Sequence, residues 1–254
     1  MTALLRSRHA PPVVGFLSLV GLLALVEVGI RVGLINRFVV PPPSSVVASL
    51  GRVVTEEGIP ERFSQTAFEA AGAALLITLV GVPAGVLLHR FTRLRLAVEG
   101  WVAAFAAAPL VLAYPLFLVI FGRSQFTIIM MGFASGVAPV ILKTLEGLSG
   151  VRRVLVDVGR SLKLTPFQQF RMVLLPAAVP TIFVGLRLGL IFALINIVGL
   201  EFLINFGGLG QLINELAERY DLPGTYAAIV FVVLVSVVFF LLLQRIEQWL
   251  RPGS

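Results

Sequence analysis

Long unbroken blocks of apolar residues are the feature that most constrains the fold of this chain. Hydrophobic residues make up 58% of the 254 residues and charged residues only 13%, whereas soluble domains carry about 25% charged residues. Several blocks exceed the roughly 18 residues that suggest a transmembrane helix, and the apolar residues are not arranged in stripes. The sequence therefore predicts an all-α polytopic membrane protein.

These blocks predict six transmembrane helices in a single domain over residues 1–254. The predicted spans are residues 12–35, 66–89, 98–121, 126–148, 176–204 and 226–244. The first is too long for the apolar region of a signal peptide, and no clean cleavage site follows it. Pro109 and Pro115 predict a kink in the third span. Glycines four residues apart predict close helix packing at Gly81 and Gly85, Gly132 and Gly136, and Gly185 and Gly189.

Basic residues are divided unequally between the two sets of loops. One set holds Arg6, Arg8, Arg90, Arg93, Arg95, Arg152, Arg153, Arg160, Lys163, Arg171, Arg245 and Arg251. The other set holds Arg37, Arg52, Arg62, Arg123 and Arg219. By the positive-inside rule the richer set is cytoplasmic, which places both termini and the loop of residues 150–175 in the cytoplasm.

Several other classes of function fit the sequence poorly. Because cysteine is absent, disulfides and thiolate sites are excluded. We predict no catalytic residue and no metal site in this chain. The basic residues are spread between spans, so nucleic acid is not an expected partner. An intramembrane protease that used Ser135 would need a histidine base on a later span, but His9 and His89 both precede it. A stand-alone secondary transporter remains an alternative, although it would usually show more spans and internal repeats.

The loop of residues 150–175 is predicted to form two short helices with a bend between them. Val151, Leu155, Val158 and Leu162 recur at spacings of three and four, so they share one helical face. We expect this first helix to end near Lys163. Its charged remaining surface fits either a docking site for another protein or an amphipathic helix resting on lipid headgroups.

The second helix of the loop carries its own start signal. Thr165 is a favourable N-cap, Pro166 suits the first helical position, and Gln168 completes a capping box. Pro176 can begin the next helix but cannot continue an old one. The loop is therefore predicted to run as helix, turn, helix and then the fifth span.

This loop resembles the EAA motif of ABC importer permeases, the binding-protein-dependent inner-membrane components. Their motif has a Glu-Ala-Ala triplet, a glycine four residues after its last alanine, and a later Leu-Pro. Here Asp157-Val158-Gly159 takes the place of the triplet, Lys163 that of the glycine, and Leu175-Pro176 is intact. The resemblance to the nitrate/sulfonate/taurine branch continues through Pro41–Ser45, Pro180, Gly185-Leu186-Arg187-Leu188 and Glu201, and spans about residues 39–250. The departures from the triplet and the glycine leave homodimer and heterodimer both open.

The resemblance implies a type I ABC importer permease fold with a cytoplasmic coupling helix between helices 4 and 5. It implies a multi-pass protein of the bacterial plasma (inner) membrane, surrounded by lipid, that is not itself an enzyme. The implied partners are ABC ATPase subunits, a second permease and an extracytoplasmic substrate-binding protein. No cofactor is expected in this chain, because ATP and Mg would be bound by the ATPase, and no Gly-x4-Gly-Lys phosphate loop occurs here. The residues expected to contact the ATPase are Leu155, Asp157, Val158, Gly159, Arg160 and Leu162.

Within that assignment, Gly159 is expected to allow the ATPase to approach closely, and Asp157 and Arg160 to form ion pairs at the rim. For the substrate path the candidates are Arg187, Asn196 and Glu201, because polar groups inside a membrane are often functional. The alternative for Asn196 is an interhelical hydrogen bond, and Arg187 could instead snorkel to the interface.

The implied substrate is a small anionic solute of the sulfonate, taurine or nitrate type. A neutral heteroaromatic or vitamin-precursor solute is the alternative within the same family. Glu27 and Arg31, four residues apart on the first span, are expected to pair with each other.

Overall fold

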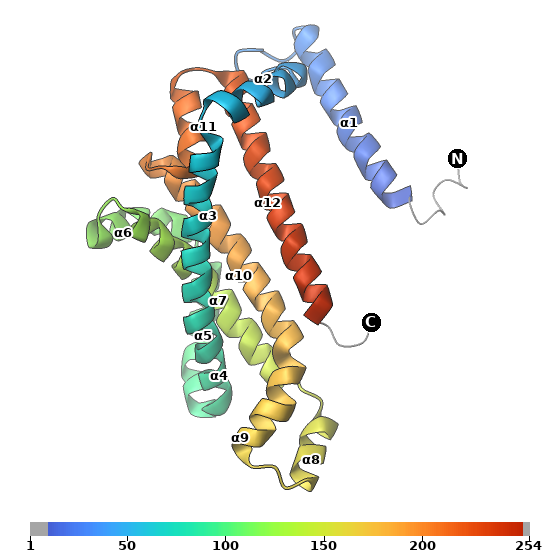
Figure 1. Ribbon diagram of the computed structural model, residues 1–254, viewed down its shortest axis with the longest axis vertical. Helices are drawn as coiled ribbons and strands as arrows, with labels where there is room; N and C mark the ends of the chain where they lie inside the picture. Colours follow the sequence, from blue (N-terminus) through green and yellow to red (C-terminus); the bar gives the residue numbers. More distant parts are fainter. Residues whose placement is uncertain (1–9, 251–254) are drawn as a thin grey trace. The chain divides into compact units, whose positions relative to one another are not determined.

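The regular elements of the described part of the chain are all helices. A computed structural model describes residues 10–250, and no strand occurs among them (Figure 1). The predicted all-α fold is confirmed. Arg6, Arg8 and Arg251, which contributed to the orientation argument, lie outside the described residues.

Five helices of the described chain are long and apolar enough to cross a membrane. They are Val13–Arg31, Ile59–Arg90, Gln125–Ser149, Pro166–Ile204 and Leu222–Gln248. Each of them overlaps or contains one predicted span. A sixth span is reached only if a bent pair of helices is counted as one.

The third predicted span is that bent pair rather than one helix with a mild kink. Thr92–Ala107 (α5) is followed by Leu110–Ala113 (η3, a 3-10 turn) and Tyr114–Phe121 (α6), with an angle of 89° between the two halves. Figure 1 shows α6 turned out to the side of α5. The cause is Pro109, which disfavours a helical conformation for the residue before it, and Ala108 is indeed extended.

The chain divides into two compact units, of which the first comprises residues 1–59 and 212–232. It contains Ala10–Arg31 (α1), Pro43–Glu56 (α2), most of Gly208–Glu218 (α11) and the start of Leu222–Leu250 (α12). Its buried core consists of Val46, Val53, Ile59, Leu212, Leu216, Ala227 and Ala228. The Asp221 carboxylate, which accepts from Arg52, raises the pKa of that guanidinium and keeps it charged.

A short-range ion pair predicted from the sequence is present in this first unit. The predicted Glu27–Arg31 pair is confirmed, with 2.8 Å between a guanidinium nitrogen and the carboxylate. The helix α2 begins at Pro43, and no side chain caps its start. Ser44 instead donates its backbone N–H and its hydroxyl to Glu27, at 3.1 and 2.8 Å.

The second unit comprises residues 60–211 and 233–254. Ile59–Leu76 (α3), a π-helical turn at Ile77–Gly81 (η2) and Val82–Arg90 (α4) form one continuous helix. Gln125–Ser149 (α7) lies against Leu175–Ile204 (α10), and these two long helices carry most of the buried core. The core residues are Ala73, Ile77, Ile128, Met131, Val140, Ala193, Ile197 and Leu200.

Glycines allow the helices of this unit to approach closely. A Cβ atom on Gly136 of α7 would lie 2.5 Å from the carbonyl oxygen of Gly189 on α10, which is closer than any real contact of that kind. A Cβ on Gly85 of α4 would similarly lie 2.8 Å from the carbonyl oxygen of Ile141. The predicted packing role of these spaced glycines is therefore confirmed.

Candidate functional site

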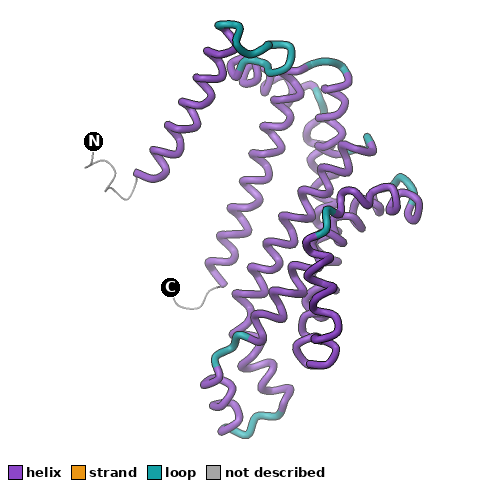
Figure 2. The backbone as a smooth tube through the Cα atoms, turned by 180° about the vertical axis from the view of Figure 1, so that it is seen from behind, coloured by secondary structure: helices purple, strands orange, loops and turns teal. Residues whose placement is uncertain are grey.

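The loop of residues 150–175 folds into the predicted helical hairpin. Arg153–Ser161 (α8) is followed by Pro166–Gln169 (α9) and by a π-helical turn at Phe170–Leu174 (η4), which leads directly into α10. Figure 2 shows a loop on either side of α8, one from α7 and one to α9. The hairpin therefore continues directly into the helical core of the second unit.

The predicted capping box at the start of α9 is confirmed. The backbone N–H of Gln168 donates to the Thr165 hydroxyl at 3.3 Å, and the Gln168 side-chain oxygen accepts from the Thr165 N–H at 2.9 Å. Both groups would otherwise be unsatisfied at a helix start. A third bond, from Gln169 Nε2 to the Val156 carbonyl oxygen at 3.1 Å, ties α9 back to α8.

Lys163 occupies the turn between the two helices in a left-handed conformation, with φ of 54°. Its N–H donates to the Arg160 carbonyl at 2.9 Å, and the Leu164 N–H donates to the Gly159 carbonyl at 3.1 Å. This pair of bonds is the Schellman motif, in which the left-handed residue is usually glycine. The glycine of the family motif therefore suits the left-handed backbone of this turn. Lys163 adopts the same conformation, but at a cost in backbone strain.

Gly159 lies on the inner side of the hairpin rather than on its outer surface. It is the buried residue of α8, and a Cβ there would contact side-chain carbons of Leu164 and Val173 at 3.5 Å. Gly159 is therefore covered by its own loop, where an added Cβ would make only ordinary van der Waals contacts, and its contact with the ATPase stays a prediction.

The outer surface of α8 is apolar as well as charged. Val158 is 52% exposed and Leu162 69% exposed, and Val154 and Leu155 are also exposed. Asp157 and Arg160 are exposed too, and they pair with each other across 3.2 Å on this surface. Such an exposed ion pair contributes about 0–1 kcal/mol, so both charges remain available to a partner. Exposed apolar side chains next to charges are typical of surfaces that bind a partner.

The three candidates for the substrate path do not form one site. Arg187 and Glu201 lie on α10 but are separated by about 20 Å along its axis, given a rise of 1.5 Å per residue. Asn196 donates to the Phe192 carbonyl of its own helix at 2.9 Å and is exposed. The predicted interhelical bond of Asn196 is therefore not formed among the described residues.

Arg187 has a partner that the sequence analysis missed. One of its terminal nitrogens lies 2.7 Å from a carboxylate oxygen of Glu247, a buried residue near the end of α12. The guanidinium also lies 5.5 Å from the ring centroid of Phe240. Because both partners come from the chain itself, the positive charge of Arg187 is already compensated.

Glu201 is fully buried, and its polar surroundings are Thr66 and the backbone N–H groups of Leu209 and Gly210. The Thr66 hydroxyl donates to one carboxylate oxygen at 2.7 Å, and the Gly210 N–H donates to the other at 2.8 Å. Glu69 and Thr66 were also missed by the sequence analysis. For Glu69 the sequence did contain a signal, since a carboxyl group within an apolar span is unusual.

Most of the chain matches a known protein family. A family model described as binding-protein-dependent transport system inner membrane component matches residues 77–252. The chain belongs to this family. Its members are permease subunits of ABC importers, multi-pass proteins of the inner membrane that work with ATPase and binding-protein partners.

Relatives of this permease have different named substrates. The choline transport system permease protein OpuBB of Bacillus subtilis (strain 168) is 31% identical over 182 residues, covering 72% of this chain and 83% of that protein. The putative aliphatic sulfonates transport permease protein SsuC of the same organism is 26% identical over 216 residues, covering 84% of this chain and 78% of that protein.

A solved structure shares the fold of this permease. The inward-facing MetNI methionine ABC transporter has a chain that matches with a TM-score of 0.67 and 21% identity, covering 76% of this chain and 96% of that chain. At this level of identity the likeness establishes the type of fold. The predicted ABC importer permease fold is therefore confirmed.

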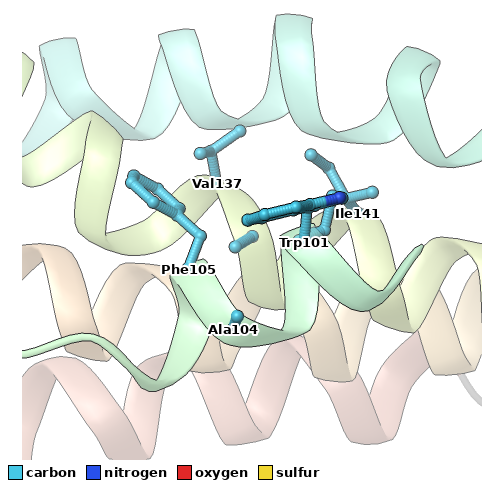
Figure 3. A pocket seen from close by; sticks show the side chains of 7 residues that line it. Trp101, Ala104, Phe105, Val137 and Ile141 are labelled. Carbon is cyan, nitrogen blue, oxygen red and sulfur yellow. The ribbon is translucent and has the colours of Figure 1, made fainter. Parts of the chain in front are cut away.

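The permease also has an apolar groove of about 430 Å³ between α5 and α7 (Figure 3). Its lining consists of Trp101, Val102, Ala104, Phe105, Val137, Ala138 and Ile141. The groove offers no charged side chain to an ionic solute. Its position on two apolar helices instead fits lipid or another apolar helix.

Proposed function

We propose that the chain is the permease subunit of an ATP-driven importer and docks a cytoplasmic ATPase through α8. The observation that carries this proposal is the exposed apolar surface of the hairpin. This surface includes Val158 on α8 and Leu162, the residue directly after α8. Gln169 joins α9 to α8 by a hydrogen bond, and η4 continues into α10 without a break, so we expect a displacement of α8 to be transmitted to the spanning helices. The orientation that places this loop and both termini in the cytoplasm belongs to the same proposal.

In this proposal the contacts to the ATPase come from Leu155, Asp157, Val158, Arg160 and Leu162. Apolar side chains at the centre of such a contact supply the binding energy, and the ion pair at its rim sets orientation. ATP and Mg are bound by the ATPase and not by this chain. A second permease, identical or different, completes the translocation path, and a binding protein delivers the solute from outside.

The docking proposal is tested by adding a charge to the apolar surface. Val158→Asp should reduce binding of the ATPase by about tenfold or more, since a buried unpaired carboxylate is costly in an interface. The measurement is co-purification of the cognate ATPase subunit, followed by solute-stimulated ATP hydrolysis in proteoliposomes.

Ser161→Asp is the matched control, because it adds the same charge at an exposed polar position of α8. This variant should keep most of the stimulated activity. Equal retention of ATPase by Val158→Asp would reject the docking surface. A permease that transports without any ATPase would instead be a stand-alone secondary transporter.

For the solute we propose a small anion of the sulfonate, taurine or nitrate class. The support is the resemblance of residues 39–250 to the nitrate/sulfonate/taurine branch, together with the aliphatic-sulfonate permease relative, which aligns over 84% of this chain. The choline permease relative has the higher identity, 31% against 26%, so choline is the rival solute. Arg187 adds no support, because Glu247 compensates its charge. Uptake of labelled taurine and choline by proteoliposomes holding the complete importer decides between them. Uptake of choline alone, or of a neutral heteroaromatic solute alone, would reject the anion.

A further inference from the structure

A second groove lies between α4 and the base of the hairpin, and we call it the α4 groove. It has a volume of about 430 Å³ and is lined by Val82, Pro83, Val86, Leu87, Arg90, Phe170 and Leu175. All of these residues belong to the second unit. Figure 1 shows α4 and the hairpin at the same end of that unit. The groove is therefore a feature of one compact part of the chain.

The α4 side of the groove is elongated, with one charge at its end. Val82, Val86 and Arg90 are spaced four residues apart, as are Pro83 and Leu87, so they form two adjoining rows along the helix. The first row extends about 12 Å along the helix axis, given a rise of 1.5 Å per residue. Everything in these rows before Arg90 is apolar. This pattern suits a long apolar chain with an anionic head.

The opposite wall is formed by Phe170 of η4 and Leu175 at the start of α10. Both side chains are half-buried, and they pack against a small buried core of Leu148, Ala178 and Ile182. Because this wall rests on the helical core, the groove is formed by packed helices and not by a loose loop.

The position of Arg90 sets the depth of the groove in the membrane. The helix Ile59–Arg90 is long and apolar enough to span a bilayer, and Arg90 is its last residue. A long basic side chain at such an end extends to the headgroups. The apolar rows then lie at the depth of the acyl chains, and Leu87 is 47% exposed there. Lipid therefore has direct access to the groove.

The charge at this end of α4 has no counterion within the described residues. Arg90 is exposed and lies 5.8 Å from the ring centroid of Phe91, but neither Arg90 nor Arg93 pairs with a carboxylate of residues 10–250. Arg95, by contrast, pairs with Glu99 at 2.8 Å. A guanidinium binds phosphate through two parallel hydrogen bonds, and basic pockets between spanning helices bind anionic lipid headgroups.

We propose that the α4 groove binds one anionic phospholipid, with its phosphate at Arg90 and an acyl chain along Val82–Leu87. A free phosphate would leave the apolar length of the groove empty, whereas a lipid with a zwitterionic head would bring its own cation to Arg90. The bound lipid contacts both α4 and Phe170, so it packs against the base of the hairpin. This site does not depend on the docking of an ATPase to α8.

Native mass spectrometry of the full-length protein in detergent tests this site by counting bound lipids. Dioleoyl phosphatidylglycerol should bind about tenfold more tightly than dioleoyl phosphatidylcholine, since a hydrogen bond to a charged group contributes that much. Glycerol 3-phosphate, which has the anionic head without the chains, should not displace the bound lipid at a hundredfold excess.

Arg90→Gln should remove most of the preference for phosphatidylglycerol, about five- to tenfold. Arg90→Lys keeps the charge and should retain most of that preference. Arg153→Gln is the matched control, because it removes the same charge from an exposed position of α8 that does not line the groove. The control should bind both lipids as the unmodified protein does.

Four outcomes would overturn the lipid site. Equal binding of the two lipids by the unmodified protein would remove the need for a cation at the groove, and an unchanged preference in Arg90→Gln would place that cation elsewhere. An equal loss in Arg153→Gln would show a general effect of net charge. Displacement of the lipid by glycerol 3-phosphate would show a site for free anions.

Discussion

Lys163 shows how a single residue can preserve a motif while departing from its usual sequence. The family motif has glycine at this position, and the backbone explains why, since φ is 54° and both Schellman hydrogen bonds are formed. A non-glycine residue in this conformation costs roughly 1 kcal/mol. The substitution therefore strains the turn but leaves its geometry intact.

This strain leads to a prediction for the loop. Lys163→Gly should slow hydrogen exchange of the Leu164 amide by about two- to fivefold, because relief of strain outweighs the added freedom of glycine when unfolded. Lys163→Val should accelerate the same exchange, since a β-branched residue tolerates positive φ poorly. Mass spectrometry of peptides from residues 150–175 measures both. Equal exchange in the two variants would contradict the conformational explanation.

At the scale of whole elements, the contact between α7 and α10 depends on the absence of side chains. Gly136 and Gly189 face each other so closely that a methyl group would meet backbone atoms of the opposite helix. In a membrane, where burial of apolar surface gives little driving force, such packing holds helices together. The glycine spacing visible in the sequence thus reports a real helix contact.

Gly136→Ala should therefore destabilise the protein. The added methyl group forces two helices apart, and overpacking of this kind costs about 1–3 kcal/mol. Gly199→Ala on α10 is the matched control, because no atom lies within 4 Å of the added carbon. The control should be neutral or slightly stabilising, as alanine is the better helix former. Thermal unfolding in detergent measures both, and equal effects would rule out the close contact as the cause.

For the molecule as a whole, the sequence predicted the elements well where signals were local. Long apolar blocks located α7 and α10, and the Thr165 capping box marked the bend in the loop. Contacts between distant residues were not predictable in this way. Glu247 as the partner of Arg187, and Thr66 as a donor to Glu201, depend on which helices pack together. The burial of Gly159 was missed for the same reason, since it depends on Leu164 and Val173 folding back.

The break at Pro109 has a consequence for the bilayer around this permease. Pro109 has no N–H to offer the Phe105 carbonyl, which accepts from Ala108 instead, and the last-turn carbonyls of α5 lose their regular helical donors. Hydrocarbon cannot replace those donors, so broken backbone at membrane depth is tolerated only beside protein or water. Lipid tails alone cannot solvate the segment around Pro109. The break is therefore expected beside protein or water, and the turn that follows it, Leu110–Ala113, does contact α7 and α10 of the same chain.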